Sequence, residues 1–318
     1  MRRRTIVGAL LATLLTAPLA GCVGQPSPTP SAPSTTSSAG TAVNVPGSAT
    51  PTGHPFTLAQ LPRIDGSTAN IPLISLAIQR LTGVPEAEAD NAVRTTGTPN
   101  AYRNLIDGDA DLLIVYEADE SVKAEIKRSG VRLELHPIGR DALVFFANAS
   151  NPVTSLTTAQ YRDIYTGRIA NWSQVGGNDV KIVAYQRPEE SGSQALLRKY
   201  VVGKAKMAKA PAELVTAEMG EIIDGVASYA NTGNALGYSV YYYLANMYGV
   251  EGIKMLGASG VAPSRETIGD GSYPYTNDFY AVIRAEASAD SPARKVLAWL
   301  TSEQGRQAVE DAGYVAAK

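Results

Sequence analysis

The chain of 318 residues contains one cysteine and two histidines. A single cysteine cannot form an internal disulfide, and so few Cys and His side chains leave almost no ligand set for a zinc site. Basic residues are not in excess either, since 28 Lys and Arg stand against 30 Asp and Glu. A large basic face for nucleic acid is therefore not expected. We predict no metal, no cofactor and no nucleic-acid partner.

The sequence also lacks an apolar run long enough to span a bilayer. The run from Ile6 to Ala17 follows three arginines; at about a dozen residues it is too short to cross roughly 30 Å of hydrocarbon as a helix. Leu19-Ala20-Gly21-Cys22 comes next, and a small residue before a lone cysteine resembles the lipobox of bacterial lipoproteins. Residues 1–22 are therefore predicted to be a lipoprotein signal peptide, with lipidation of Cys22. An ordinary signal peptide with an incidental cysteine is the alternative.

Residues 23–55 contain no Asp, Glu, Lys or Arg and are rich in Pro, Ser and Thr. Such a stretch cannot bury enough apolar surface to offset its ordering entropy, so we expect a disordered tether. The composition changes at Phe56, where the folded body is predicted to begin. The protein would then be extracytoplasmic and lipid-anchored to the bacterial cell membrane rather than spanning it.

Strand-like and helix-like patterns alternate along the folded body. Apolar residues at helical spacing from Leu73 to Leu81 predict a helix that begins near Ser67. Near the C-terminus, another helix is expected with Pro292 in its first turn. Strands are expected at Leu61–Ile64, Asp111–Tyr116, Ala142–Ala147, Lys181–Tyr185, Ala235–Tyr243 and Phe279–Ile283. This alternation predicts an α/β fold with mostly parallel sheets, in two lobes rather than one.

Three predicted strand-to-helix corners carry small hydroxyl residues: 65–68, 96–98 and 187–193. Each corner offers hydroxyls and backbone N–H groups at a helix start, where the helix dipole favours an anion. Gly192 would let the backbone approach a ligand closely, and Arg187 has a planar fork suited to an oxyanion. Plain N-capping is the alternative at each corner. Together the three corners favour an anion site near the carboxyl ends of the strands.

Five motifs carry a family resemblance that extends from Arg63 to Val315. They are Asp65-Gly66-Ser67-Thr68 with Pro72-Leu73, Ile164-Tyr165-Thr166-Gly167-Arg168-Ile169-Ala170-Asn171-Trp172, Val175-Gly176-Gly177, Gln186-Arg187-Pro188-Glu189-Glu190-Ser191-Gly192-Ser193, and Ala235-Leu236-Gly237-Tyr238. The sequence resembles the PstS-type phosphate-binding lipoproteins of bacterial ABC transporters, which have a type II periplasmic-binding-protein fold. The second and fourth motifs are specific when they occur together.

The resemblance implies a two-lobed fold and a function without catalysis. One lobe would hold residues 56–146 and 276–318 and the other residues 147–275, joined by crossover strands at Ala142–Ala147 and Phe279–Ile283. Each lobe would be a mostly parallel sheet flanked by helices. The protein would capture a tetrahedral oxyanion, inorganic phosphate first of all, and deliver it to the permease and ATPase subunits of an ABC importer. We expect a monomer.

The family's anion contacts correspond to particular residues of this chain. They are Ser67, Thr68, Thr98, Arg187, Ser191, Gly192 and Ser193. Glu189 corresponds to the acid that orients the family's arginine.

One position departs from the family pattern. Phosphate binders have an aspartate after the strand at 111–116, whereas this chain has Tyr116 followed by Glu117. A carboxylate there can accept the proton that phosphate keeps near pH 7, which fully ionised sulfate lacks. Our hypothesis is that Glu117 is this acceptor, with Tyr116 beside it; a solvated loop acid is the alternative.

Other functions fit the residues less well. His54 lies at the edge of the tether, which leaves only His136 for a Ser-His device, and no G-x-S-x-G or P-loop motif occurs. A ligand-sensing or envelope-interaction lipoprotein on the same fold remains the alternative, binding another oxyanion or an organophosphate. Tyrosines cluster at 238–243 and 273–280; packing is the simpler explanation, and an aromatic platform for a larger ligand is the other.

Overall fold

A computed structural model describes residues 53–317, except residues 190, 217–218, 229–233 and 250. The predicted signal peptide with Cys22, and residues 23–52 of the predicted tether, lie outside the described residues. Within the described part, no helix is both long and apolar enough to cross a membrane.

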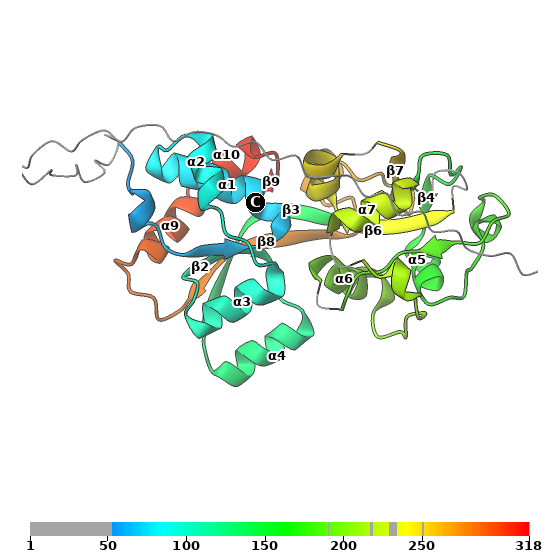
Figure 1. Cartoon of the computed structure of the whole chain (residues 1–318), viewed down its shortest axis with the longest axis horizontal. Coiled ribbons are helices and arrows are strands. Elements are labelled where there is room, and N and C mark those ends of the chain that lie inside the picture. The colour runs from blue at the N-terminus through cyan, green and yellow to red at the C-terminus, as the bar shows by residue number, and fades with distance from the viewer. Residues whose placement is uncertain (1–52, 190, 217–218, 229–233, 250, 318) are drawn as a thin grey trace, which may run out of the picture. The chain divides into compact units, whose positions relative to one another are not determined.

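A first sheet holds the N-terminal strands and the last ones (Figure 1). Its strands are β1 (Ile64–Gly66), β2 (Leu112–Tyr116), β8 (Thr276–Arg284), the first part of β3 (Leu133–Asn148) and β9 (Val315–Ala316). β1 and β2 are parallel, whereas β8 lies antiparallel between β2 and β3. β2 is buried along its whole length, as expected of a central strand covered on both faces.

Helices cover both faces of this sheet. They are α1 (Ile71–Thr82), α2 (Glu86–Ala92), α3 (Thr98–Asp107), α4 (Glu120–Ser129), α9 (Pro292–Leu300) and α10 (Glu303–Asp311), with short turns η1 (Leu58–Gln60) and η2 (Thr68–Asn70). α1 and α3 contact β1 from opposite sides (Figure 1). The residues of α1 predicted to be apolar, including Leu73 and Leu81, are buried, and Gly83 ends the helix in the left-handed conformation.

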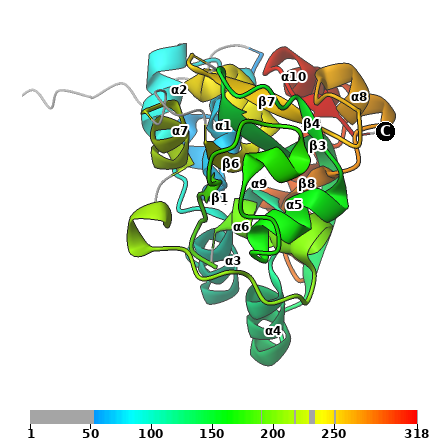
Figure 2. The same cartoon turned by 90° about the vertical axis from the view of Figure 1, so that its right-hand side faces the viewer.

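A second sheet is built on the remaining part of β3 (Figure 2). β3 pairs there with β6 (Ala235–Val240) and β7 (Ile253–Ala258), β5 (Val183–Ala184) pairs with β6, and β4 (Ser155–Leu156) pairs with β7. Around it lie α5 (Thr158–Tyr165), η3 (Trp172–Val175), α6 (Gly192–Leu197), η4 (Arg198–Val202), η5 (Ala212–Leu214), α7 (Met219–Ser228), η7 (Tyr243–Tyr248) and α8 (Arg265–Asp270). α6 and α7 both pack on β3 and β6, on opposite sides of them (Figure 1).

The α/β class and the flanking helices are confirmed, but the prediction of mostly parallel sheets is wrong. Among the described strands, only the pairs β1–β2, β4–β7 and β5–β6 are parallel. The pairs β2–β8, β3–β8, β3–β9, β3–β6 and β3–β7 are antiparallel. The reason is that β3 runs through both sheets, so that each strand returning beside it runs in the opposite direction.

The predicted crossover strands correspond to β3 and β8. Ala142–Ala147 lies in β3 where it leaves the first sheet: Ala142 is paired with β8 and Leu143 with β6. Phe279–Ile283 lies in β8, which begins at Thr276, directly opposite Ala142. The predicted strand to Tyr243 ends earlier, at Val240, because a helical segment starts at Tyr241.

Candidate functional site

Two of the predicted corners meet through a pair of hydroxyls. The Oγ of Ser67, at the end of β1, lies 2.6 Å from the Oγ1 of Thr98, the first residue of α3. Both side chains are buried, at 4% and 6% exposure. The backbone N–H of Tyr116, the last residue of β2, donates to the same Ser67 oxygen at 3.3 Å. The carboxyl ends of β1 and β2 and the start of α3 therefore converge on one point, as the strand-end rule predicts.

Asp65 fixes the second corner to the first. Its carboxylate accepts hydrogen bonds from the backbone of Gly66 (2.6 Å) and Thr96 (2.9 Å), from the Thr96 hydroxyl (2.7 Å) and from Asn104 Nδ2 (2.7 Å). Because Thr96 lies two residues before Thr98, these bonds set where the Thr98 hydroxyl stands. From the sequence alone, Asp65 belongs to the first corner without an assigned role.

The third corner comes from the second half of the fold and lies against the first two. Ser191 caps α6 by accepting a hydrogen bond from Gln194 N at 3.2 Å. A Cβ placed on Gly192 would lie 3.4 Å from the Oγ1 of Thr98. The hydroxyl of Ser193 is buried and has no hydrogen-bond partner among the described residues. The backbone of Gly192 thus approaches the Ser67–Thr98 pair, and a buried hydroxyl follows it by one residue.

Arg187 is held at the start of this corner. Its side chain is buried, with 8% exposure, and its backbone N–H donates to the hydroxyl of Tyr238 at 2.8 Å. The Tyr238 hydroxyl in turn donates to Gln194 Oε1, within α6. β6 therefore fixes the backbone of Arg187 through Tyr238, whose hydroxyl is held in turn by α6.

Glu189 binds a different arginine from the one expected. Its carboxylate accepts hydrogen bonds from Arg198 Nη2 at 2.6 Å, from Arg198 Nε at 3.2 Å and from Gln194 Nε2 at 3.2 Å. The hydrogen bonds from Arg198 hold the pKa of Glu189 below its usual range. In the structure Glu189 orients Arg198, because the helical turn after Ser191 brings Arg198 back over it.

Glu117 is engaged by two lysines. One carboxylate oxygen accepts from Lys123 Nζ at 2.7 Å, and the other accepts from Lys199 Nζ at 2.5 Å. Burial opposes ionisation of Glu117, but the hydrogen bonds from Lys123 and Lys199 outweigh it and lower its pKa. Lys123 belongs to α4 and Lys199 to η4, so this carboxylate joins the two halves of the fold. Such an arrangement favours an ion-pair role over acceptance of a ligand proton.

Tyr116 contributes its backbone, rather than its ring, to the hydroxyl pair. Its side chain is buried, and the hydroxyl donates to Asp141 Oδ2 at 2.6 Å. Its carbonyl accepts from the hydroxyl of Tyr102, in α3, at 3.2 Å. The tyrosine that replaces the family's aspartate is therefore directed toward a carboxylate of β3.

Thr68 and Asn70 complete the first corner. Thr68 is exposed at the start of η2, whereas Asn70 is fully buried and its amide has no hydrogen-bond partner among the described residues. Asn70 carries no functional signal in the sequence, because an Asn before a helical Ile-Pro pair is typical of an N-cap.

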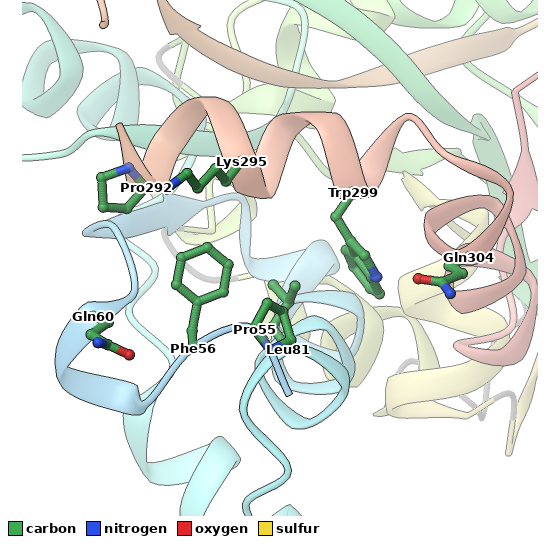
Figure 3. A pocket seen from close by; sticks show the side chains of 8 residues that line it. All are labelled: Pro55, Phe56, Gln60, Leu81, Pro292, Lys295, Trp299 and Gln304. Atoms are coloured by element: carbon green, nitrogen blue, oxygen red, sulfur yellow. The ribbon is translucent and has the colours of Figure 1, made fainter. Parts of the chain in front are cut away.

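A cleft of about 770 Å³ opens between the segments that follow the site residues. One wall comes from Glu117 to Lys123, and the other comes from Glu189 and the α6–η4 segment as far as Lys204. A second hollow, of about 580 Å³, lies between residues 55–60 and α9. Figure 3 shows Phe56 and Trp299 facing this second hollow. None of the predicted anion contacts lines it.

The tyrosine clusters pack mainly in the interior. Tyr238 and Tyr275 surround Phe145, with ring centroids 6.3 and 5.9 Å from it. Tyr273 contacts Tyr275 edge to face at 5.6 Å. This packing favours the structural explanation over an aromatic platform.

Comparisons with known proteins agree with the motifs and the geometry. The model of the PBP superfamily domain matches residues 32–304. The phosphate-binding protein PstS of Bacillus subtilis (strain 168) is 28% identical over 256 residues, which cover 79% of each chain. The PstS of Staphylococcus epidermidis is 26% identical over 230 residues, 69% of this chain and 68% of that protein.

Solved structures show the same fold. A candidate phosphate ABC transporter substrate-binding protein from Clostridium perfringens, crystallised with bound phosphate, has a TM-score of 0.63 at 24% identity. It covers 80% of this chain and 99% of its own. An ABC-type phosphate transport receptor from Vibrio cholerae has a TM-score of 0.59 at 23% identity, covering 80% and 98%. The resemblance drawn from the sequence motifs is confirmed, and the chain belongs to the PBP superfamily.

Proposed function

We propose that this protein captures a tetrahedral oxyanion, inorganic phosphate first of all, outside the cytoplasmic membrane and delivers it to an ABC importer without chemical change. The observation that carries the proposal is the approach of Gly192 to Thr98, because it brings three corners rich in donors together from two halves of the chain. The names of the PstS relatives support phosphate as the ligand.

The anion would lie between two lobes, residues 56–146 with 276–318 and residues 147–275. The hydroxyls of Ser67 and Thr98 would donate from the first lobe. Ser193, the backbone of Gly192 and the guanidinium of Arg187 would bind from the second lobe. Such groups act at hydrogen-bond distance, and hydrogen bonds to a charged ligand contribute about 1.5 to 3 kcal/mol each. Closure would turn the lobes about β3 and the entry to β8.

The remaining predicted residues lie around these contacts. Thr68 and Ser191 flank the hydroxyl pair and the α6 start, and Glu189 holds Arg198 beside the cleft. We assign Glu117 to closure of the cleft, which its bonds to Lys123 and Lys199 support.

The lipid anchor on Cys22, the tether, the permease and ATPase partners and the monomeric state are parts of the same proposal. Export and cleavage before Cys22 would hold the folded body at the outer surface of the membrane. In cells, Cys22→Ala should release the protein from the membrane fraction. Retention of the variant in that fraction would contradict lipidation.

The decisive experiment is calorimetric titration of the protein, stripped of bound ligand by partial unfolding and refolding. Phosphate should bind, and Arg187→Ala should weaken the affinity by about ten- to a hundredfold, because one charged donor is lost. Arg187→Lys keeps the charge but loses the planar fork, so it should restore only part of the affinity. Arg168→Ala is the control, since that arginine is 62% exposed and lies beside Asp163. Absence of phosphate binding, or equal affinities in the Arg187 and Arg168 variants, would contradict the proposal.

A further inference from the structure

Asp141 is a buried carboxylate at the point where β3 leaves the first sheet. It is 1% exposed, it lies opposite Asn277 of β8, and the next residue is the last of β3 that pairs with β8. Its described hydrogen-bond donors are neutral: the Tyr116 hydroxyl at 2.6 Å, Ala142 N at 2.7 Å and Tyr242 N at 3.0 Å. Burial raises the pKa of Asp141 to about 6, against the effect of these hydrogen bonds. Burying a carboxylate costs free energy unless hydrogen bonds compensate, and these three donors supply the compensation.

One chain of contacts leads from Asp141 to the hydroxyl pair through Tyr116. The ring of Tyr116 ends on Asp141, while its backbone N–H donates to Ser67 Oγ. Its carbonyl is held by Tyr102 of α3, the helix that starts at Thr98. Asp141 thereby holds the residue that contacts Ser67 of the first corner and the helix that starts at the second.

A second chain of contacts leads to the same corner from its other side. Asp141 holds the backbone of Tyr242, whose ring stacks on Tyr314 with centroids 3.5 Å apart and planes 10° from parallel. The hydroxyl of Tyr242 donates to Ala312 O at 2.5 Å. The hydroxyl of Tyr314 donates to the carbonyl of Ala69, two residues after Ser67.

We propose that Asp141 is the positioning residue of the anion site, fixing the 67–70 corner from both sides and tying it to the strand about which the lobes turn. This inference rests on the proposed function. Asp141 touches Tyr116 from the first sheet and Tyr242 from the helical segment that follows β6, so the place of Ser67 depends on the second sheet as well as the first. Substitution at Asp141 or Tyr116 should therefore weaken anion binding more than it weakens the fold.

The test compares Tyr116→Phe, Asp141→Asn and their double variant with Tyr161→Phe. Tyr161 is a matched control because it is also fully buried and also donates its hydroxyl, to Gly257 O at 2.9 Å, but away from the site. Inorganic phosphate affinity, thermal unfolding and hydrogen exchange of segments 65–70 and 238–243 are measured for each. Tyr116→Phe should lower the affinity about tenfold, with a thermal midpoint close to that of Tyr161→Phe. The double variant should bind no more weakly than Asp141→Asn alone, since both changes break one chain of contacts.

The outcomes separate the inference from the proposed function. Equal phosphate affinities in Tyr116→Phe and Tyr161→Phe, with unchanged exchange at 65–70, would overturn the role of Asp141. If the wild-type protein does not bind phosphate, the proposed function fails and hydrogen exchange alone decides. Faster exchange at both segments in Asp141→Asn supports the positioning role, and exchange confined to residues beside position 141 refutes it.

Discussion

The ion pair between Glu117 and Lys199 joins the two walls of the cleft. Removal of one of these charges therefore tests whether the cleft closes over the ligand. Lys199→Gln removes that pair, whereas Lys123→Gln removes the other lysine on the same carboxylate, which comes from α4, directly after Glu117. In the proposed mechanism, opening of the lobes would separate Glu117 from Lys199 but leave Lys123 in place. Lys199→Gln should therefore speed phosphate release, and Lys123→Gln should not.

The size of the effect follows from the exposure of the two groups. The Lys199 and Glu117 side chains are 48% and 32% exposed, so the pair lies in a largely solvated setting. Exposed ion pairs contribute about 0.2 to 1 kcal/mol, which corresponds to a factor of about 1.5 to 5 in the release rate. The effect should shrink near 1 M salt, where the screening length falls to roughly 3 Å.

Stopped-flow release of phosphate at low and high salt measures this directly. Lys199 Nζ also lies 5.3 Å from the centroid of the Tyr200 ring, and Lys199→Gln removes that contact as well. Glu117→Gln is the control, because it breaks both ion pairs and keeps Lys199. Glu117→Gln should match Lys199→Gln in rate and leave the preference for phosphate over sulfate unchanged. Equal rates in the two lysine variants, or an increase that salt does not reduce, would refute the closure role. A collapse of the preference in Glu117→Gln would instead restore its role as proton acceptor.

Two further predictions concern single positions. Gly192→Ala should fold normally, since its methyl group would lie in ordinary contact at 3.4 Å from Thr98 Oγ1, but it should bind phosphate about tenfold more weakly because that methyl group would occupy part of the proposed anion site; unchanged affinity by calorimetry would remove this contact from the site. Burial raises the pKa of Asp141 from 3.8 to about 6, so the folded state takes up a proton between pH 6 and 4 that the unfolded chain binds only below about 4. The wild type should therefore gain about 2 kcal/mol over Asp141→Asn as the pH falls from 7 to 4, measured by urea unfolding, and a constant difference would contradict this.

Local sequence patterns predicted the elements in which apolar residues are buried and polar residues are exposed. β2 and the apolar face of α1 are of this kind, and both were predicted. The first part of β3 was largely missed, since residues 133–141 mix exposed and buried positions and include His136, Pro137 and a bulge before Gly139. The direction of strand pairing could not be predicted either, because it depends on how the long β3 is shared between two sheets.

The same distinction applies to the site. Hydroxyl corners are short-range patterns, and the structure brings Ser67, Thr98 and Gly192 together as predicted. The partners of the acidic residues are long-range. Lys199 lies 82 residues from Glu117, and Tyr242 lies 101 residues from Asp141. One sequence contains no record of such pairings, so the roles of these acids could only be assigned from the fold.

These pairings bear on how the site would distinguish phosphate from sulfate. The carboxylates described around it already accept protein hydrogen bonds: Asp65 holds the 96–98 corner, Glu117 holds two lysines, and Asp141 lies behind Tyr116. A proton on phosphate would then meet hydroxyl oxygens, which can accept as well as donate. A neutral acceptor contributes about 1 kcal/mol, less than a charged one.

The preference for phosphate over sulfate should therefore be modest, about fivefold. Calorimetric titration of phosphate in the presence of excess sulfate measures it, with nitrate as the control for ionic strength. If a thousandfold excess of sulfate has no more effect than nitrate, a carboxylate must accept the phosphate proton after all. Glu117 would then have to leave one of its lysines when the ligand binds, and the release rate of Lys199→Gln would show whether it does.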